Sequence, residues 1–263
     1  MKRIWHQSAT ELVGLDAYKR AIEAHAADVI GDEAQVDVRG LPTGAYAGAA
    51  PSAVLANAYA YHRILSCVIE NAIRAEREGY DAFVVGSFSE PFLREIRSAV
   101  DIPVASLAES GVLVGCSLGH YVAMISNAPS VLWMTKTAVD KYALGARVLD
   151  IVALDPPLDE HALSSAFANP GPVIASFRAS ATRLVARGAD VIIPAEGVLA
   201  GVLVRHGVRE IEGAAVLDVF AVTWHYALML ARLWSKAGLR VGRSWHYRRD
   251  DPTLVARLSA RQP

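Results

Sequence analysis

The chain has 263 residues, enough for one compact core or two packed lobes, and its formal net charge is −1. Hydrophobic residues make up 53% and charged residues 20%, which excludes a disordered chain, and the charge balance favours neither a nucleic acid nor a membrane surface as partner. Two cysteines exclude a disulfide scaffold and a zinc site built from cysteines. Because the N-terminal residues lack the apolar centre of a signal peptide, we expect a cytoplasmic protein.

Strand-like and helix-like patterns alternate along the chain. Apolar residues recur every three to four positions over residues 52–78, which predicts a helix that ends at Gly79. Glu90-Pro91 is expected to open the next helix, since proline is tolerated in a first turn. Four segments have the apolar pattern of strands: residues 4–8, 34–38, 81–86 and 102–106. This order predicts an α/β fold with parallel sheets and crossover helices.

The chain contains an internal repeat. Residues 79–87, Gly-Tyr-Asp-Ala-Phe-Val-Val-Gly-Ser, are similar to residues 188–196, Gly-Ala-Asp-Val-Ile-Ile-Pro-Ala-Glu. A helical segment precedes and follows each of them, so the spacing favours two similar halves. The alternative is two unrelated buried strands that share a common Gly-x-Asp start.

Two halves of this kind predict two pseudo-symmetric Rossmann-like lobes with the active site in the cleft between them. We expect residues 1–110 and 215–263 in the first lobe and residues 111–214 in the second. Ser87 and Glu196 end the repeated segments, at the carboxyl ends of parallel strands, where open α/β sheets bind ligands. Free N–H groups at the following helix starts would favour an anionic group, so we expect a small acidic or enolisable substrate.

The segments that end in these two residues resemble those of the aspartate/glutamate racemase superfamily, most closely its hydantoin-racemase branch. Residues 86–91, Gly-Ser-Phe-Ser-Glu-Pro, are similar to that branch's Gly-Cys-Phe-Gly-Asp-Pro. Residues 188–201 are similar to its second signature, in which a cysteine precedes Ala-Gly, and the likeness extends over residues 59–226. The resemblance implies the two-lobed fold and a cofactor-independent isomerase that transfers a proton at a carbon beside a carbonyl of a small acidic or cyclic amide substrate.

The sequence departs from this family at both catalytic positions. The resemblance implies one cysteine in each half, on opposite faces of the substrate carbon, but the two positions here read Ser87 and Glu196. A carboxylate in a cleft is a competent general base, whereas an unactivated hydroxyl is not, so we expect Glu196 to be the base. Ser87 and Ser89 are expected to donate hydrogen bonds to the substrate. The alternatives are a Glu196 that only caps a helix and a Ser87 that is an ordinary turn residue.

Further residues are predicted to contact the substrate because they end the first strand, flank the two signatures or begin the second half. These residues are His6, Gln7, Ser8, Phe88, Ser89, Glu90, Tyr121, Asn127 and Gly197. Racemisation would also need a second acid/base group, for which His6, Glu90 and His120 are the candidates. No metal-ligand spacing and no glycine-rich nucleotide loop occur, so we expect no metal and no cofactor.

Several functions remain open at this point. One alternative is a lyase that resembles the arylmalonate decarboxylases, in which one acid/base residue suffices. Others are a hydrolase in which Glu196 activates water and a non-catalytic protein that binds a small molecule. In every case we expect a small-molecule partner, no nucleic acid or membrane partner, and a homo-oligomer.

Overall fold

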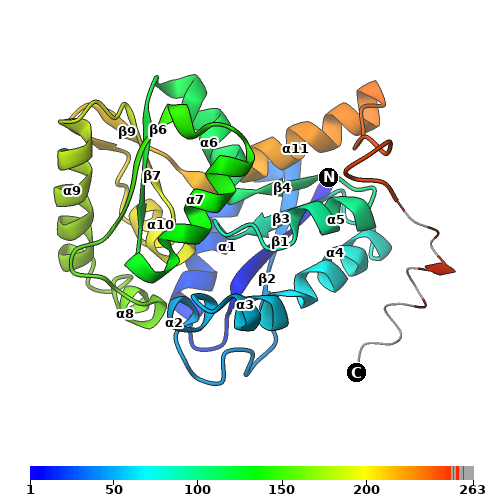
Figure 1. Ribbon diagram of the computed structural model, residues 1–263, viewed down its shortest axis with the longest axis horizontal. Coiled ribbons are helices and arrows are strands. Elements are labelled where there is room, and N and C mark those ends of the chain that lie inside the picture. Colours follow the sequence, from blue (N-terminus) through cyan, green and yellow to red (C-terminus); the bar gives the residue numbers. More distant parts are fainter. Residues whose placement is uncertain (250, 252, 255–256, 258–263) are drawn as a thin grey trace.

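The computed structural model describes residues 1–249, 251, 253–254 and 257. Two β-sheets flanked by helices make up the molecule (Figure 1). The first has the order β2 (Ala34–Leu41), β1 (Lys2–Glu11), β3 (Ala82–Gly86) and β4 (Val104–Ser106). The second has the order β6 (Val148–Ala153), β5 (Val122–Ser126), β7 (Val191–Pro194), β9 (Ala214–Val216) and β8 (Glu210–Ile211). The described pairings are parallel except that of β8 with β9.

The strand order confirms the internal repeat. Each sheet has its second strand at one edge, followed by its first and its third strand. A further strand follows the third, β4 in the first sheet and β9 in the second, where β8 adds an extra edge strand. Thus β1, β2, β3 and β4 of the first sheet correspond to β5, β6, β7 and β9 of the second. The repeated segments contain β3 and β7, which occupy the same inner position in their sheets. The fold is therefore α/β with two lobes of equivalent topology.

The helix expected over residues 52–78 is in fact three helices. They are α2 (Pro51–Leu55), α3 (Ala58–Leu65) and α4 (Cys67–Arg77). The break before α3 has a local cause, because the Asn57 side chain accepts hydrogen bonds from the N–H groups of Tyr59 and Ala60 and so starts a new helix. Apolar spacing continues across this cap, which is why the spacing alone did not reveal it.

The helix expected to open at Glu90-Pro91 begins later, as α5 (Leu93–Ala99). Glu90 has a φ of 47° and Phe92 a φ of 54°, both in the left-handed region that side-chain-bearing residues rarely adopt. Residues 87–92 therefore form a loop with a strained backbone between β3 and α5. Strain of this kind persists only where surrounding contacts hold it.

The remaining helices cover the sheets and join the lobes. They are α1 (Asp16–Ile30), α6 (Leu107–Leu118), α7 (Leu132–Lys141), α8 (Glu160–Ser165), α9 (Gly171–Val185), α10 (Gly197–Arg205) and α11 (Val219–Ala237). On one face of the first sheet, Trp5 and Phe83 pack in a core of their own. On the other face, Ile4 and Val84 belong to a core that continues through α11 into the second sheet. None of the helices within the described ranges has the length and apolar character that crossing a membrane requires.

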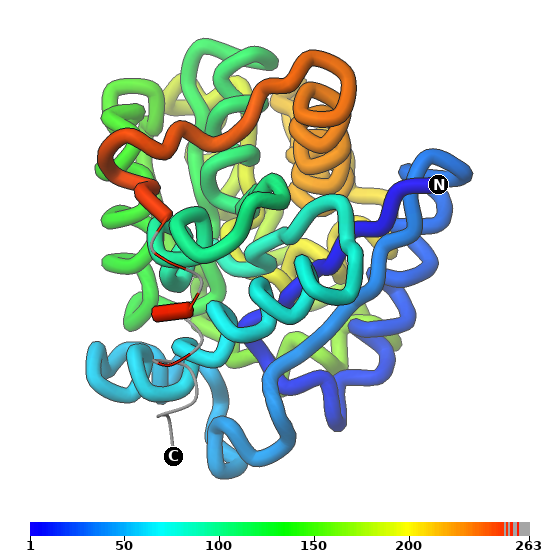
Figure 2. Tube along the Cα trace, turned by 90° about the vertical axis from the view of Figure 1, so that its right-hand side faces the viewer, coloured from blue at the N-terminus to red at the C-terminus, as the bar shows by residue number. Residues whose placement is uncertain are grey.

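The C-terminal part of the chain is divided between the lobes. Helix α11 packs against α6, β3 and β4, but β9 forms its ladder with β7. The strand at residues 214–216 thus lies in the second sheet and not in the first lobe, where the boundary at residue 215 placed it. After α11 the chain turns back over the first lobe, where Arg243 pairs with Asp101 at 2.7 Å (Figure 2). Of the range expected there, residues 250, 252, 255–256 and 258–263 lie outside the described residues.

Candidate functional site

A cavity of about 90 Å³ opens where strands of both sheets end. The first lobe contributes Ser8 from β1 and Ser87 from the end of β3, while the second contributes Asn127 and Glu196 from the ends of β5 and β7. The carboxyl ends of the equivalent strands therefore meet around one shared space.

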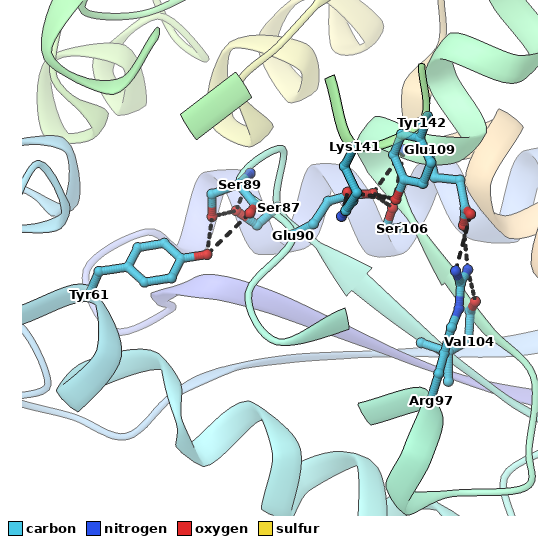
Figure 3. Close-up of polar contacts among 10 residues, drawn as sticks. All are labelled: Tyr61, Ser87, Ser89, Glu90, Arg97, Val104, Ser106, Glu109, Lys141 and Tyr142. Atoms are coloured by element: carbon cyan, nitrogen blue, oxygen red, sulfur yellow. Dashed lines mark hydrogen bonds and ion pairs between the residues drawn. The ribbon is translucent and has the colours of Figure 1, made fainter. Parts of the chain in front are cut away.

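Hydroxyl groups form the first-lobe wall of this cavity. Ser87 Oγ lies 2.9 Å from Ser89 Oγ, and the Ser89 N–H donates to Ser87 Oγ at 3.3 Å. Tyr61 of α3 donates its hydroxyl proton to Ser89 Oγ at 3.2 Å (Figure 3). Burial raises the pKa of Tyr61 to about 12, so its phenol is a neutral donor. No base contacts the Ser87 hydroxyl within the described part of the chain, so this serine can donate a hydrogen bond but is not activated as a nucleophile.

Glu196 both caps a helix and lines the cavity. Its Oε1 accepts from the Val198 N–H at 2.9 Å and its Oε2 from the Leu199 N–H at 2.6 Å, at the start of α10. Burial raises the pKa of this carboxyl to about 8, with the nearby charge of Glu160 as the second cause, although the backbone donors act in the opposite direction. A group of this basicity exchanges protons near neutral pH.

The expected free N–H groups at the start of α10 are not available. The Glu196 carboxyl accepts two of them, from Val198 and Leu199, and therefore takes the place that an anionic substrate group would have occupied. The helix start stabilises a side chain of the protein itself. This corrects the expectation of an anion cradle there.

Two titratable residues that line the cavity were not predicted from the sequence. Glu160, the first residue of α8, is 6% exposed and accepts hydrogen bonds from Ser52 and Asn127. Tyr18 of α1 is 1% exposed, and burial together with the charge of Glu196 raises the pKa of its phenol well above the usual range. Nothing in the local sequence of either residue indicates a cavity, because both reach it through the packing of helices that are distant along the chain.

Several predicted residues do line the cavity. They are Ser8, Ser87, Phe88, Ser89, Asn127, Glu196 and Gly197. Gly197 allows close packing there, because a Cβ at this position would come 3.0 Å from the Tyr18 hydroxyl. The structure thus brings both ends of the repeated segments and their neighbours to one place.

The other predicted contacts do not line it. His6 is completely buried, accepts a hydrogen bond from the Trp224 indole at 3.2 Å, and is kept neutral because burial lowers its pKa to about 4. Its ring lies against Gly86, where a Cβ would come 2.5 Å from His6 Nε2. Gln7, on the opposite face of β1, accepts hydrogen bonds from Trp5 and Asn71.

The two remaining predicted residues lie away from the cavity for different reasons. Tyr121, like His120, precedes β5 and lies at the amino end of that strand, whereas the cavity is at the carboxyl end. Glu90 does not line the cavity; it points away from Ser87 and Ser89 and is buried in a polar cluster (Figure 3). It accepts hydrogen bonds from Tyr142 at 2.6 Å and from the Glu109 N–H at 3.0 Å, and it forms an ion pair with Lys141.

The Glu90 cluster joins the two lobes. Glu90 belongs to the strained loop after β3, and Lys141 and Tyr142 belong to the end of α7 in the second lobe. On the first-lobe side, the cluster continues to Glu109, which pairs with Arg97 (Figure 3). These contacts explain how the loop that carries Ser87 and Ser89 keeps its left-handed residues. Among the described residues, no group of three metal-binding side chains gathers in a way that could hold a metal ion.

Comparisons with known proteins agree with this architecture. Residues 15–227 match the family described as Asp/Glu/Hydantoin racemase. The hydantoin racemase of Pseudomonas sp. (strain NS671) is 36% identical over 84 residues, 32% of this chain and 34% of that protein, so the match spans about a third of the relative's length.

Solved structures share the fold at low sequence identity. An allantoin racemase from Klebsiella pneumoniae is 18% identical with a TM-score of 0.75, over 95% of this chain and 94% of that one. One from Pseudomonas fluorescens is 16% identical with a TM-score of 0.72, over 95% and 97%. A glutamate racemase from Bacillus anthracis is 13% identical with a TM-score of 0.58, over 99% and 95%. With two equivalent lobes, a cavity between them and a family match over most of its length, this chain belongs to the Asp/Glu/Hydantoin racemase family.

Proposed function

We propose that the protein is a racemase-type isomerase that moves a proton at a carbon beside a carbonyl group of a small substrate. One observation carries this proposal: the Glu196 carboxyl of one lobe and the Ser87 and Ser89 hydroxyls of the other line the same cavity. Membership of the racemase family supports the reaction type.

In this reaction the ionised form of Glu196 removes the proton, and the hydroxyls stabilise the negative charge that develops on the carbonyl oxygen. If Tyr61 donates to Ser89 and Ser89 donates to Ser87, the Ser87 proton is left free for the substrate. A base with a pKa of about 8 is better suited to taking a proton from carbon than an ordinary carboxylate, because base strength rises with pKa.

The charge of the cavity favours an uncharged substrate. Two carboxyls, Glu160 and Glu196, line it, and no lysine, arginine or histidine does so in the described ranges of the chain. These two carboxyls would repel a carboxylate on the substrate. The N–H groups of a cyclic amide, in contrast, would find hydrogen-bond acceptors in them. We therefore propose a hydantoin-like or allantoin-like ring as substrate, in keeping with the names of the relatives. A malonate, which a decarboxylase would need, fits this charge poorly.

The test is incubation of single enantiomers of hydantoins and allantoin in heavy water, followed by NMR and polarimetry. We expect deuterium to enter at the carbon beside the carbonyl while optical activity is lost. Glu196→Gln is expected to lower kcat/KM by about 10³-fold or more, in the range for loss of an acid/base group. The control, Glu210→Gln, removes an exposed carboxylate from β8 and should leave the rate unchanged.

Other outcomes would replace the proposal. Carbon dioxide release from substituted malonates would indicate a decarboxylase, and ring opening would indicate a hydrolase. Binding without turnover, unaffected by Glu196→Gln, would indicate a binding protein.

A further inference from the structure

The second carboxyl of the cavity, Glu160, is held as firmly as Glu196 but by different elements. Its Oε2 accepts from the Ser52 hydroxyl at 3.0 Å and from the Ser52 N–H at 3.3 Å, in α2. Its Oε1 accepts from Asn127 Nδ2 at 3.3 Å, at the end of β5. Three donors therefore fix this carboxyl beside the cavity that it lines together with Glu196.

No positive charge offsets these two carboxyls. Neither forms an ion pair with any described lysine, arginine or histidine. The other titratable groups that face them are phenols, Tyr18 of α1 beside Glu196 and Tyr46 of the loop after β2 near Glu160. Burial raises the pKa of both phenols, so each is neutral. Two carboxylates in one small cavity without a cation repel each other, and this cost is relieved when one of them holds a proton.

We propose that Glu160 and Glu196 share a single proton near neutral pH, so that the cavity offers a substrate one carboxylate and one carboxylic acid. This gives the proposed reaction the second proton-transfer group that neither His6, Glu90 nor His120 supplies. The use of the pair in catalysis rests on the proposed function, but the shared proton itself does not.

The proton count balances over one turnover. The carboxylate takes the proton from the substrate carbon, and the C–H electron pair passes into the enolate, whose oxygen is stabilised by the serine hydroxyls. The carboxylic acid then gives its proton to the opposite face of the same carbon, and the electron pair of the enolate forms the new C–H bond, so that the configuration is inverted. After the turnover, the carboxyl that acted as base holds the one proton of the pair, and the carboxyl that acted as acid is ionised. The pair can then catalyse the reverse reaction or exchange the proton with water.

The pair and a lone base predict opposite pH profiles. A lone Glu196 base would become more active as pH rises through its pKa of about 8. The pair loses its carboxylic acid in the same range, so its kcat is expected to fall above about pH 8. Such a bell-shaped profile reports a required acid and a required base.

The shared proton can be measured without any substrate, by a pH titration of the ¹³C-labelled glutamate carboxyl signals. In the native protein we expect a step near pH 8 that is absent in Glu196→Gln. In Glu160→Gln the step should move down by about one to three pH units, because the neighbouring charge is gone. Asp159→Asn is the matched control, since it removes an exposed charge from the residue before Glu160 and asparagine still caps α8. It should leave the step in place.

The outcomes separate the two proposals. A step that stays near pH 8 in Glu160→Gln, or that is missing in the native protein, overturns the shared proton whatever the activity shows. A step that moves as expected supports the pair even if no tested substrate reacts, in which case only the proposed function fails. Activity that keeps rising above pH 8 overturns the use of the pair in catalysis.

Discussion

The two lobes have the same strand order but end their equivalent strands with different chemistry. His6 of β1 pairs with Val84 of β3, and Met124 of β5 pairs with Ile193 of β7, so these positions correspond in the repeat. The first strand of each lobe leads to a serine, but the third strand leads to Ser87 in one lobe and to Glu196 in the other. The equivalent third strands of the duplicated fold thus place the Ser87 hydroxyl on one wall of the cavity and the Glu196 carboxyl on the other.

The backbone after these strands also differs. In both lobes the N–H two residues further on donates to the side chain, from Ser89 to Ser87 and from Val198 to Glu196. In the second lobe α10 begins at once, but in the first lobe the chain makes a strained loop whose Glu90 is anchored to α7. The comparison teaches that the second lobe holds the Glu196 carboxyl by local hydrogen bonds, whereas the first lobe depends on contacts with the other lobe to hold the loop of Ser87 and Ser89.

The largest change in stability is expected from Glu90→Ala, which removes the contact that only the first lobe has. Leu199, the corresponding residue of the second lobe, is apolar and buried. The substitution leaves the Tyr142 hydroxyl and other buried donors without their acceptor, while Lys141, half exposed, can return to water. We expect the free energy of unfolding in urea to fall by about 3–4 kcal/mol. Glu95 of α5, a half-exposed carboxylate that pairs with Arg94, is the control, and an equal loss in Glu95→Ala would contradict this assignment.

The burial of His6 in the first lobe is expected to lower the stability of the protein at acidic pH. Its pKa of about 4 in the folded chain lies below the value of 6.5 that it has when unfolded, so the unfolded chain binds more protons between these values. Stability is therefore lost as the pH falls from 6.5 towards 4, by up to about 3 kcal/mol from this group. His6→Met introduces the residue found at the equivalent position of the second lobe. In this variant the free energy of unfolding, measured in urea, should depend less on pH between 6.5 and 4. The exposed His62→Met is the control, and a parallel response of both variants would refute the role of burial.

The smallest of these effects is expected from Ser87→Ala, which removes one donor from the first-lobe wall. Loss of one hydrogen bond to the developing oxyanion should lower kcat/KM by about 10–100-fold, less than the loss expected for Glu196→Gln. The fold should not change, because Ser87 bonds only within its own loop. Ser117→Ala, which removes an exposed hydroxyl from α6, is the control for the assay on hydantoins or allantoin. Full activity in Ser87→Ala would show that the serine is an ordinary turn residue.

Local sequence patterns were sufficient for the four strands of the first sheet, the repeat and the two residues that end it. They depend on neighbours along the chain, since a run such as residues 81–86 is apolar because both of its faces are covered. The same patterns misplaced helix starts, because the Asn57 cap and the left-handed Glu90 act on single residues and leave the apolar spacing intact.

The sequence by itself determined the α/β fold and its duplication, because strand patterns depend on neighbours along the chain. The meeting of Ser87 and Glu196, which follow strands of different sheets, was predicted from the equivalence of the two halves and from the binding of ligands at the carboxyl ends of parallel strands. Only the tertiary structure decided which other groups reach that cavity. Glu160 and Tyr18 enter it on helices brought there by packing, while His6 is turned into the core against Trp224. Burial and the distance to neighbouring charges set the proton affinity of Glu196, and both depend on residues far away along the chain.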